Sequence, residues 1–198
     1  MAGDLLSRAP VAALRSRYDE PWRHYHVWDH PQAMLRHLST AQADGVAVAD
    51  HDAAVGFILW HDAIYDPQAT GGRNERLSAE LCRHEMAPLA SAASVDRAVA
   101  AIVATIDHRL PAGDCPDAAL LLDIDLSILG AGAAAFDAYD DAIRREYAHV
   151  VEADYRAGRR AILTRFLERD RLYLTEWGHA RWEDAARANV RRAIDRLG

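Results

Sequence analysis

Residues 119–135 read A-L-L-L-D-I-D-L-S-I-L-G-A-G-A-A-A, and this stretch decides between two folds. A buried strand that leads into the G-x-G-x-x-A turn at Gly130 would begin a dinucleotide-binding Rossmann sheet. Such a sheet needs several strands that alternate with helices, and no other segment of the sequence has a strand-like pattern. Asp123 and Asp125 would also lie inside its central strand. We therefore interpret Gly130 and Gly132 as a break between two helices.

Outward from this stretch, apolar residues recur at helical spacing along most of the chain. Prolines and glycines such as Pro67, Pro88 and Gly158 stand between the apolar segments. The pattern predicts an all-α fold and a single domain over residues 1–198, without repeats or linkers. The expected helices are 8–18, 30–44, 50–65, 74–87, 94–108, 117–129, 133–156, 159–169 and 179–197.

The composition excludes several classes of function. A formal net charge of -7 opposes sequence-independent nucleic-acid binding, which needs a basic surface that releases counterions. A small phosphorylated ligand is compatible with this charge, because a metal ion and a few arginines can neutralise it locally. All 23 basic residues are arginine, so lysine Schiff-base chemistry is excluded.

The sequence also predicts where the protein resides. Its first residues lack the basic segment and apolar stretch of a signal peptide, and no run approaches the roughly 18 apolar residues of a membrane span. The isolated Cys82 and Cys115 do not suggest a disulfide framework. We expect a cytoplasmic protein that binds neither nucleic acid nor membrane, and the sequence leaves a homo-oligomer open.

Two segments place ionisable side chains in apolar surroundings. In the expected helix 50–65, His61 and Asp62 have mostly apolar residues three and four positions away, and so does Asp125 in its own helix. An ionised carboxylate is costly there unless it is paired or metal-bound. A metal ion held jointly by Asp125, Asp62 and His61 would satisfy all three groups. Asp123 points elsewhere and is the weaker candidate.

The segment H-Y-H-V-W-D-H, residues 24–30, can supply a fourth ligand. His30 is expected at the start of a helix, and His26, one turn earlier, is the fallback. Mixed imidazole and carboxylate ligands suit manganese, iron, nickel or zinc better than calcium or magnesium. The structural alternative is a core histidine with satisfied hydrogen bonds, or an aspartate that caps a helix or pairs with arginine.

The order of these residues resembles the HD superfamily of metal-dependent phosphohydrolases, whose metal ligands match His30, His61, Asp62 and Asp125. Over residues 20–190, the blocks H-Y-H-x-x-D-H, W-H-D-A-I-Y-D-P, N-E-R-L-S-A-E-L, L-D-I-D-L-S-I-L-G and I-R-R-E-Y are similar to one bacterial subgroup of predicted HD phosphohydrolases of similar length. The resemblance implies an HD-type domain of eight or nine helices with the metal site between core helices. It also implies nucleotides or other small phosphoesters as substrates.

This resemblance leads to a mechanistic hypothesis. The metal ion lowers the pKa of a water molecule, which then supplies hydroxide for attack on phosphorus. Asp66, one turn beyond Asp62 on the same helical face, is the first candidate for the general base. Glu75 is the second candidate, although a glutamate in the first turn of a helix also complements the helix dipole.

Further residues are candidates for substrate binding. His108 matches the extra histidine of some superfamily members and is also a helix-end histidine, favourable there when charged. Arg73 and Arg76 follow the candidate site in a glycine-rich loop and can bind phosphate oxygens. The wider set of candidate arginines adds Arg23, Arg109 and Arg159.

Two other classes of function remain alternatives. A non-catalytic HD sensor would bind a metal ion or a nucleotide and signal by changing shape, although the sequence contains no partner domain to receive that signal. A metal-free structural helical domain is the third interpretation.

Overall fold

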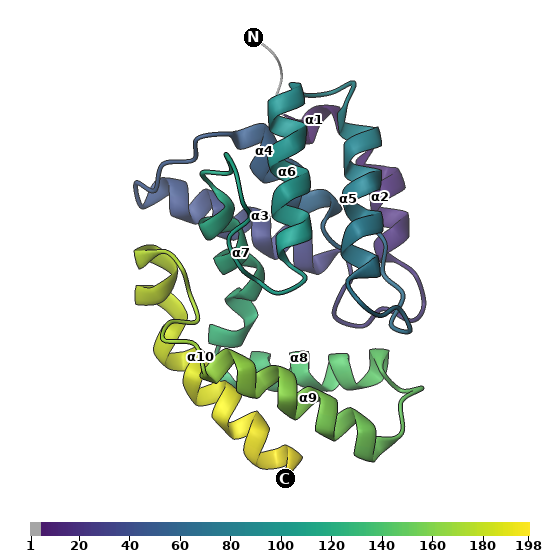
Figure 1. Cartoon of the computed structure of the whole chain (residues 1–198), viewed down its shortest axis with the longest axis vertical. Coiled ribbons are helices and arrows are strands. Elements are labelled where there is room, and N and C mark those ends of the chain that lie inside the picture. Colours follow the sequence, from purple (N-terminus) through teal and green to yellow (C-terminus); the bar gives the residue numbers. More distant parts are fainter. Residues whose placement is uncertain (1–4) are drawn as a thin grey trace. The chain divides into compact units, whose positions relative to one another are not determined.

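The computed structural model describes residues 5–198, and within this range it contains ten α-helices, one 3₁₀-helix and no strand (Figure 1). The all-α prediction is confirmed, and the dinucleotide-binding sheet is excluded. The elements are α1 (Leu5–Arg8), α2 (Val11–Tyr18), α3 (Asp29–Ala43), α4 (His51–Trp60), α5 (Arg73–Met86), α6 (Ala92–Ala104), α7 (Ala118–Asp125), the 3₁₀-helix η1 (Leu126–Gly130), α8 (Ala133–Glu146), α9 (Glu152–Leu167) and α10 (Glu176–Leu197).

The helices form two compact units, which divide within α7. The first unit ends at Leu122, and the second is Asp123–Gly198. The single domain over residues 1–198 therefore stays a prediction.

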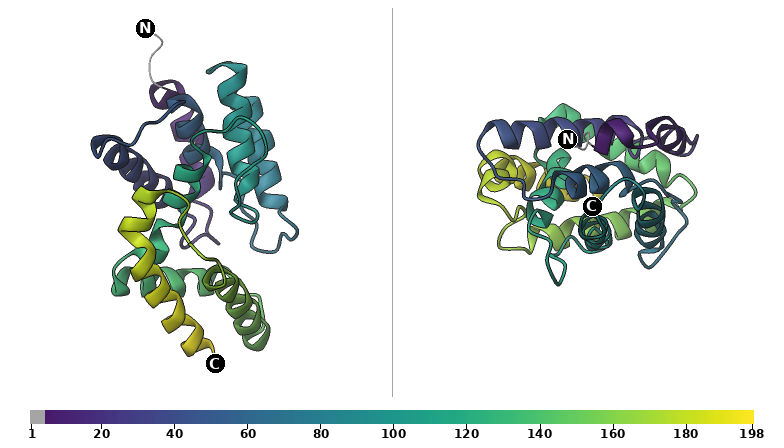
Figure 2. Two further views of the ribbon diagram at one scale, coloured as in Figure 1. Left: turned by 60° about the vertical axis from the view of Figure 1, so that its left-hand side comes forward. Right: turned by 90° about the horizontal axis from the view of Figure 1, so that it is seen from above.

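The first unit is built around α4. Residues 53–60 of this helix are all buried, and a helix that is apolar on every side must be covered on every side. α1, α3, α5 and α6 all contact it, and Figure 2 shows α5 and α6 side by side. A Cβ atom at Gly56 would lie 2.5 Å from Met86 Sδ and 3.2 Å from Ala98 Cβ, so the glycine allows α5 and α6 to approach closely. This firmly packed helix leads directly into His61.

The second unit is built around α10, which contacts η1, α8 and α9. A Cβ atom at Gly130 would lie 2.4 Å from Trp182 Cβ and 2.8 Å from Trp182 Cα. The side-chain amide of Asn189 donates hydrogen bonds to the carbonyl oxygens of Leu129 (2.9 Å) and Ala131 (2.8 Å). The break between two helices predicted at Gly130 is therefore confirmed, and it rests directly on the backbone of α10.

Some helix boundaries differ from the prediction. The expected helix 133–156 is divided into α8 and α9, and Arg144 holds the intervening turn by donating to the carbonyl oxygens of Tyr147 (2.7 Å) and Val150 (3.3 Å). That turn contains neither glycine nor proline, so no local residue pattern predicted it. Conversely, Gly158 lies inside α9 and does not end a helix.

By length and composition, no single helix in residues 5–198 qualifies as a membrane span. The segments Ala118–Gly130 and Ala133–Glu146, which are bent by 100° at the break between them, pass that test only as a pair.

Candidate metal centre

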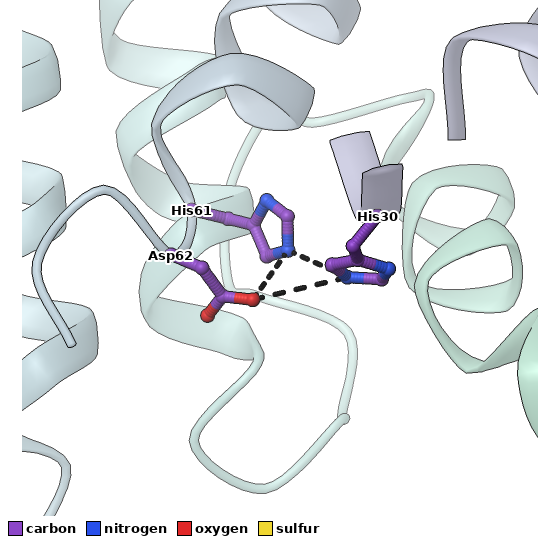
Figure 3. A group of neighbouring side chains, drawn as sticks. All are labelled: His30, His61 and Asp62. Atoms are coloured by element: carbon purple, nitrogen blue, oxygen red, sulfur yellow. Dashed lines mark hydrogen bonds and ion pairs between the residues drawn. The ribbon is translucent and has the colours of Figure 1, made fainter. Parts of the chain in front are cut away.

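His30, His61 and Asp62 point toward one another in the first unit (Figure 3). His61 Nε2 lies 3.0 Å from Asp62 Oδ2 and 3.1 Å from His30 Nε2, and His30 Nε2 lies 3.8 Å from Asp62 Oδ2. Around a single ion with bonds of about 2.0–2.1 Å, ligand atoms lie about 3–3.5 Å apart. Two of the three separations lie in this range and the third, 3.8 Å, is slightly longer, so a small movement of one side chain would let all three share one ion.

His30 reaches this position from the start of α3. The helix begins at Asp29 with Pro31 in its first turn, where the fixed φ of proline suits a helix start. The predicted position of His30 at the start of a helix is therefore confirmed. Its Nδ1 atom lies 3.3 Å from the hydroxyl of Tyr25, so Tyr25 fixes the orientation of the ring.

The imidazole of His61 is buried and oriented by α4. Its Nδ1 atom lies 3.1 Å from the carbonyl oxygen of Ile58, and its ring stacks on Phe57 at a centroid distance of 5.2 Å. A carbonyl oxygen can only accept, so the contact with Ile58 requires a proton on Nδ1. When Nε2 carries no second proton, its lone pair points at the cluster. Metal-binding histidines in proteins are typically held in this way.

The cluster needs a positive charge between its members. If the only ring proton of His61 is on Nδ1, its Nε2 and the Asp62 carboxylate face each other as two acceptors, which repel. Burial raises the pKa of Asp62, but the positive charges of His61, His26 and His30 outweigh it and hold this pKa below its ordinary value. The carboxylate is therefore ionised, and either an extra proton on the imidazoles or a metal ion must balance it. The donor set fits a divalent transition ion.

The structure corrects the helix on which these residues were predicted. α4 ends at Trp60, so the expected helix 50–65 is too long. Arg23 donates to the carbonyl oxygen of Asp62 at 2.7 Å and to that of the next residue at 3.2 Å. These two carbonyl oxygens therefore accept from a side chain and not from the amides of a further helical turn. His61 is the C-cap residue, and Asp62 lies beyond the helix.

Asp66 consequently does not lie one turn beyond Asp62 on a shared helical face, and that prediction is wrong. Asp66 is exposed, and its carboxylate accepts from the backbone amide of Gln68 at 2.9 Å. Asn74 in α5 bonds both to the backbone amide of Asp66 (3.1 Å) and to its carbonyl oxygen (3.0 Å). The contacts of Asp66 within the structure are those of a stabilised turn, and its role as a base stays a prediction.

The other candidates around the start of α5 have structural contacts of their own. Glu75 lies in the first turn of α5, where its charge complements the helix dipole as expected. Arg73 and Arg76 are exposed, and Arg76 donates to the carbonyl oxygen of Gly71. Their roles in catalysis and phosphate binding stay predictions.

Two further histidines lie outside the cluster of three. His26 is half-buried, stacks on Tyr65 at a centroid distance of 4.2 Å, and meets His30 edge-on at 6.4 Å. It therefore lines the cluster without joining it. The predicted helix end at His108 is wrong, because α6 ends at Ala104 and His108 follows in a turn with a φ of 50°.

Asp123 and Asp125 occupy different environments within the second unit. Asp125 is the half-buried last residue of α7, and its part as a fourth ligand stays a prediction. Asp123 is buried, and it accepts hydrogen bonds from the amides of Leu174 (2.6 Å) and Thr175 (2.8 Å) and from the Thr175 hydroxyl (2.6 Å). Asp123 therefore stabilises the start of α10.

Sequence reasoning misjudged two arginines. Arg23 and Arg159, considered there as phosphate-binding candidates, are both buried and bound to protein groups. Arg159 pairs with Asp140 at 2.9 Å in the second unit. The acidic Glu20, three residues before Arg23, was the only side-chain partner nearby in the sequence, because the carbonyls of Asp62 and Ala63 that Arg23 binds lie far along the chain.

Comparison of the chain with models of protein families, with curated proteins and with solved structures gave no match. The chemistry of the centre is therefore interpreted from its own residues.

Proposed function

We propose that the protein is a metal-dependent phosphohydrolase whose divalent transition ion, manganese, iron, nickel or zinc, is held by His30, His61 and Asp62. The observation that supports the proposal is the convergence of two imidazole nitrogens and one carboxylate oxygen at mutual distances of 3.0–3.8 Å. The resemblance of the ordered motifs to the HD superfamily supports phosphoester hydrolysis as the reaction. Asp125 is the proposed fourth ligand.

The residues of the chain prepare the site in several ways. Ile58 and Tyr25 fix the two imidazole rings, and the ionised Asp62 supplies the negative charge that attracts a cation. A bound divalent ion supplies a water nucleophile at neutral pH by lowering the pKa of that water. Asp66 and Glu75 are the proposed acid–base residues.

The proposed substrate is a small phosphorylated molecule such as a nucleotide. Arg73, Arg76, His108 and His26 are the proposed contacts to it, since arginine binds phosphate oxygens through paired N–H donors. We also propose a cytoplasmic location, and we expect no binding of nucleic acid or of membranes.

The proposal is tested by metal analysis and a substrate screen. The purified protein is loaded separately with each of the four ions and incubated with nucleotides, sugar phosphates and model esters. We expect hydrolysis only in the presence of an ion, and we expect His61→Ala to lose both the ion and the activity. His84→Ala, which removes an exposed histidine of α5, is the matched control and should keep both. An unchanged metal content in His61→Ala would refute the proposed site.

The same screen distinguishes the proposed enzyme from the chief alternative, a non-catalytic sensor. A non-catalytic sensor would bind a nucleotide and leave it intact over hours in the presence of every ion. If the metal-loaded protein hydrolyses any ester and His61→Ala does not, the result supports the enzyme and excludes the sensor.

A further inference from the structure

Arg23 is a buried cation that does not face the ligand cluster. Its side chain has 0% exposure. Its guanidinium group lies over the rings of Tyr18 and Tyr65, at 5.1 Å and 5.3 Å from their centroids. Glu20 Oε2 accepts from its Nε at 2.9 Å and balances the charge. A guanidinium group held on all sides in this way has a fixed orientation.

The remaining N–H groups of Arg23 join the two segments that carry the ligand residues. One terminal nitrogen donates to the carbonyl oxygen of His26 (3.2 Å) and to that of Asp62 (2.7 Å). The other donates to the carbonyl oxygen of Ala63 (3.2 Å). The first of these carbonyls belongs to the segment that leads to His30, and the other two follow His61 directly.

These segments are otherwise distant along the chain, and the second of them is not helical. The backbone that carries Asp62 therefore lacks the i to i−4 hydrogen bonds that hold a side chain in a helix. Contacts from other elements hold it instead, among them the Ser78 hydroxyl, which bonds to the amide (3.0 Å) and carbonyl oxygen (3.2 Å) of Ile64. Arg23 is the group among these that also reaches the segment before His30.

We propose that Arg23 is a positioning residue for the metal centre: its planar guanidinium sets the distance between His30 and the His61–Asp62 pair. This inference rests on the proposed metal site. Lysine cannot replace arginine here, because an ammonium group lacks the planar fork that addresses carbonyls on two segments at once. Groups behind the ligands typically contribute a factor of about 10–100 to metal affinity.

The second unit contains a buried arginine, Arg159, whose substitution serves as a control for a general loss of stability. Arg159 is also buried, pairs with a carboxylate of Asp140 at 2.9 Å, and lies over the ring of Tyr139 at 5.2 Å. Arg159→Lys therefore removes a comparable buried guanidinium without touching the segments that carry His30 and Asp62.

The experiment measures Mn²⁺ affinity by calorimetry in the unsubstituted protein, in Arg23→Lys and in Arg159→Lys. Amide hydrogen exchange of residues 61–66 is followed in the same three proteins without added metal. We expect Arg23→Lys to weaken Mn²⁺ binding by about 10- to 100-fold and to accelerate exchange in residues 61–66. Arg159→Lys should change the affinity by less than about twofold and leave exchange in this segment unaltered.

A second variant covers the case in which Arg23→Lys does not fold. Glu20→Gln keeps the guanidinium but removes the charge that orients it, and it should weaken Mn²⁺ binding less than Arg23→Lys is expected to. Equal affinity in Glu20→Gln and in the unsubstituted protein would then overturn the inference.

The outcomes separate this inference from the proposed function. Equal losses of affinity in both lysine variants, or unchanged affinity in Arg23→Lys, would overturn the positioning role while the metal site stands. An unsubstituted protein that binds no Mn²⁺ or other divalent ion would refute the proposed function. In that case, faster exchange in residues 61–66 confined to Arg23→Lys would still support the role of Arg23 in holding the segment, and unchanged exchange would refute it.

Discussion

Asp62 in the first unit and Asp123 in the second are two aspartates that follow apolar segments but have opposite kinds of partner. Asp123 accepts three hydrogen bonds from backbone amides and a hydroxyl at 2.6–2.8 Å. Asp62 faces two imidazole nitrogens, at 3.0 Å and 3.8 Å, which donate to it only when they carry a proton. A carboxylate surrounded by donors is satisfied by the protein, whereas acceptors that converge on one point require a cation. Both aspartates are close to apolar residues in sequence, so only their partners distinguish a structural site from a chemical one.

The largest expected effect is on metal binding by Asp62. Asp62→Ala removes the only carboxylate of the cluster of three, and we expect bound metal and phosphoester turnover to fall by at least about 100-fold. Metal content is measured by mass spectrometry and turnover by phosphate release. Asp184→Ala, at an exposed position of α10, should change neither quantity. Full metal occupancy in Asp62→Ala would remove the contrast between the two aspartates.

The next effect concerns the break that precedes α8 in the second unit. A Cβ atom at Gly130 would lie 2.8 Å from the backbone of Trp182, whereas a Cβ atom at Gly132 would meet nothing within 4 Å. Gly130→Ala should therefore lower the free energy of unfolding by about 3 kcal/mol, because a backbone atom cannot move aside as a side chain can. Urea denaturation measures this loss, and Gly132→Ala is the matched control with little expected change. Similar losses in both variants would contradict the close contact with α10.

Asp123→Asn should have a smaller effect, on stability alone. The amide has nearly the same shape as the carboxylate, but its NH₂ group must face at least one of the donors of Leu174 and Thr175. We expect a loss of about 2 kcal/mol in the free energy of unfolding, the usual cost of an unsatisfied buried group. Metal affinity per folded molecule should stay the same. A drop in affinity at unchanged stability would show that the two aspartates do not have separate functions.

Much of the fold could be predicted from local sequence patterns. Features that depend on contacts between distant segments, such as the different partners of Asp62 and Asp123, could not. The apolar run of α4 and the break at Gly130 follow from periodicity and from glycine chemistry within a few residues. The end of α4 at Trp60 does not, because the groups that hold the non-helical backbone after it, such as Arg23, lie far along the sequence. The predicted helix was therefore extended to the stop signal at Pro67, which lies too far along the chain.

The same distinction applies to the candidate site. The structure brings together His61 and Asp62, which were found as ionisable residues among apolar neighbours, and His30, which was found in the histidine-rich segment 24–30. The environment of Asp66 was misjudged because its helix was assumed to continue, and the buried position of Arg23 was missed. These errors concern contacts between distant segments, which have no period in the sequence.

The smallest expected effect is the pH dependence of a third kind of buried carboxylate. Burial raises the pKa of Glu183, but the amides of Leu172 and Tyr173 and the side chain of Arg187 outweigh it and hold this pKa below its ordinary value of 4.5. Because the pKa is lower in the folded state, the stabilisation is complete above pH 4.5 and is lost as the pH falls through the folded pKa.

We therefore expect the free energy of unfolding to decrease on acidification, with Glu183 contributing about 1 kcal/mol of that decrease, the scale of one net hydrogen bond. Urea denaturation between pH 3 and pH 6 measures it, and Glu183→Gln should reduce the slope of stability against pH. A slope that is the same in both proteins would mean that the donors around Glu183 do not favour its charged form.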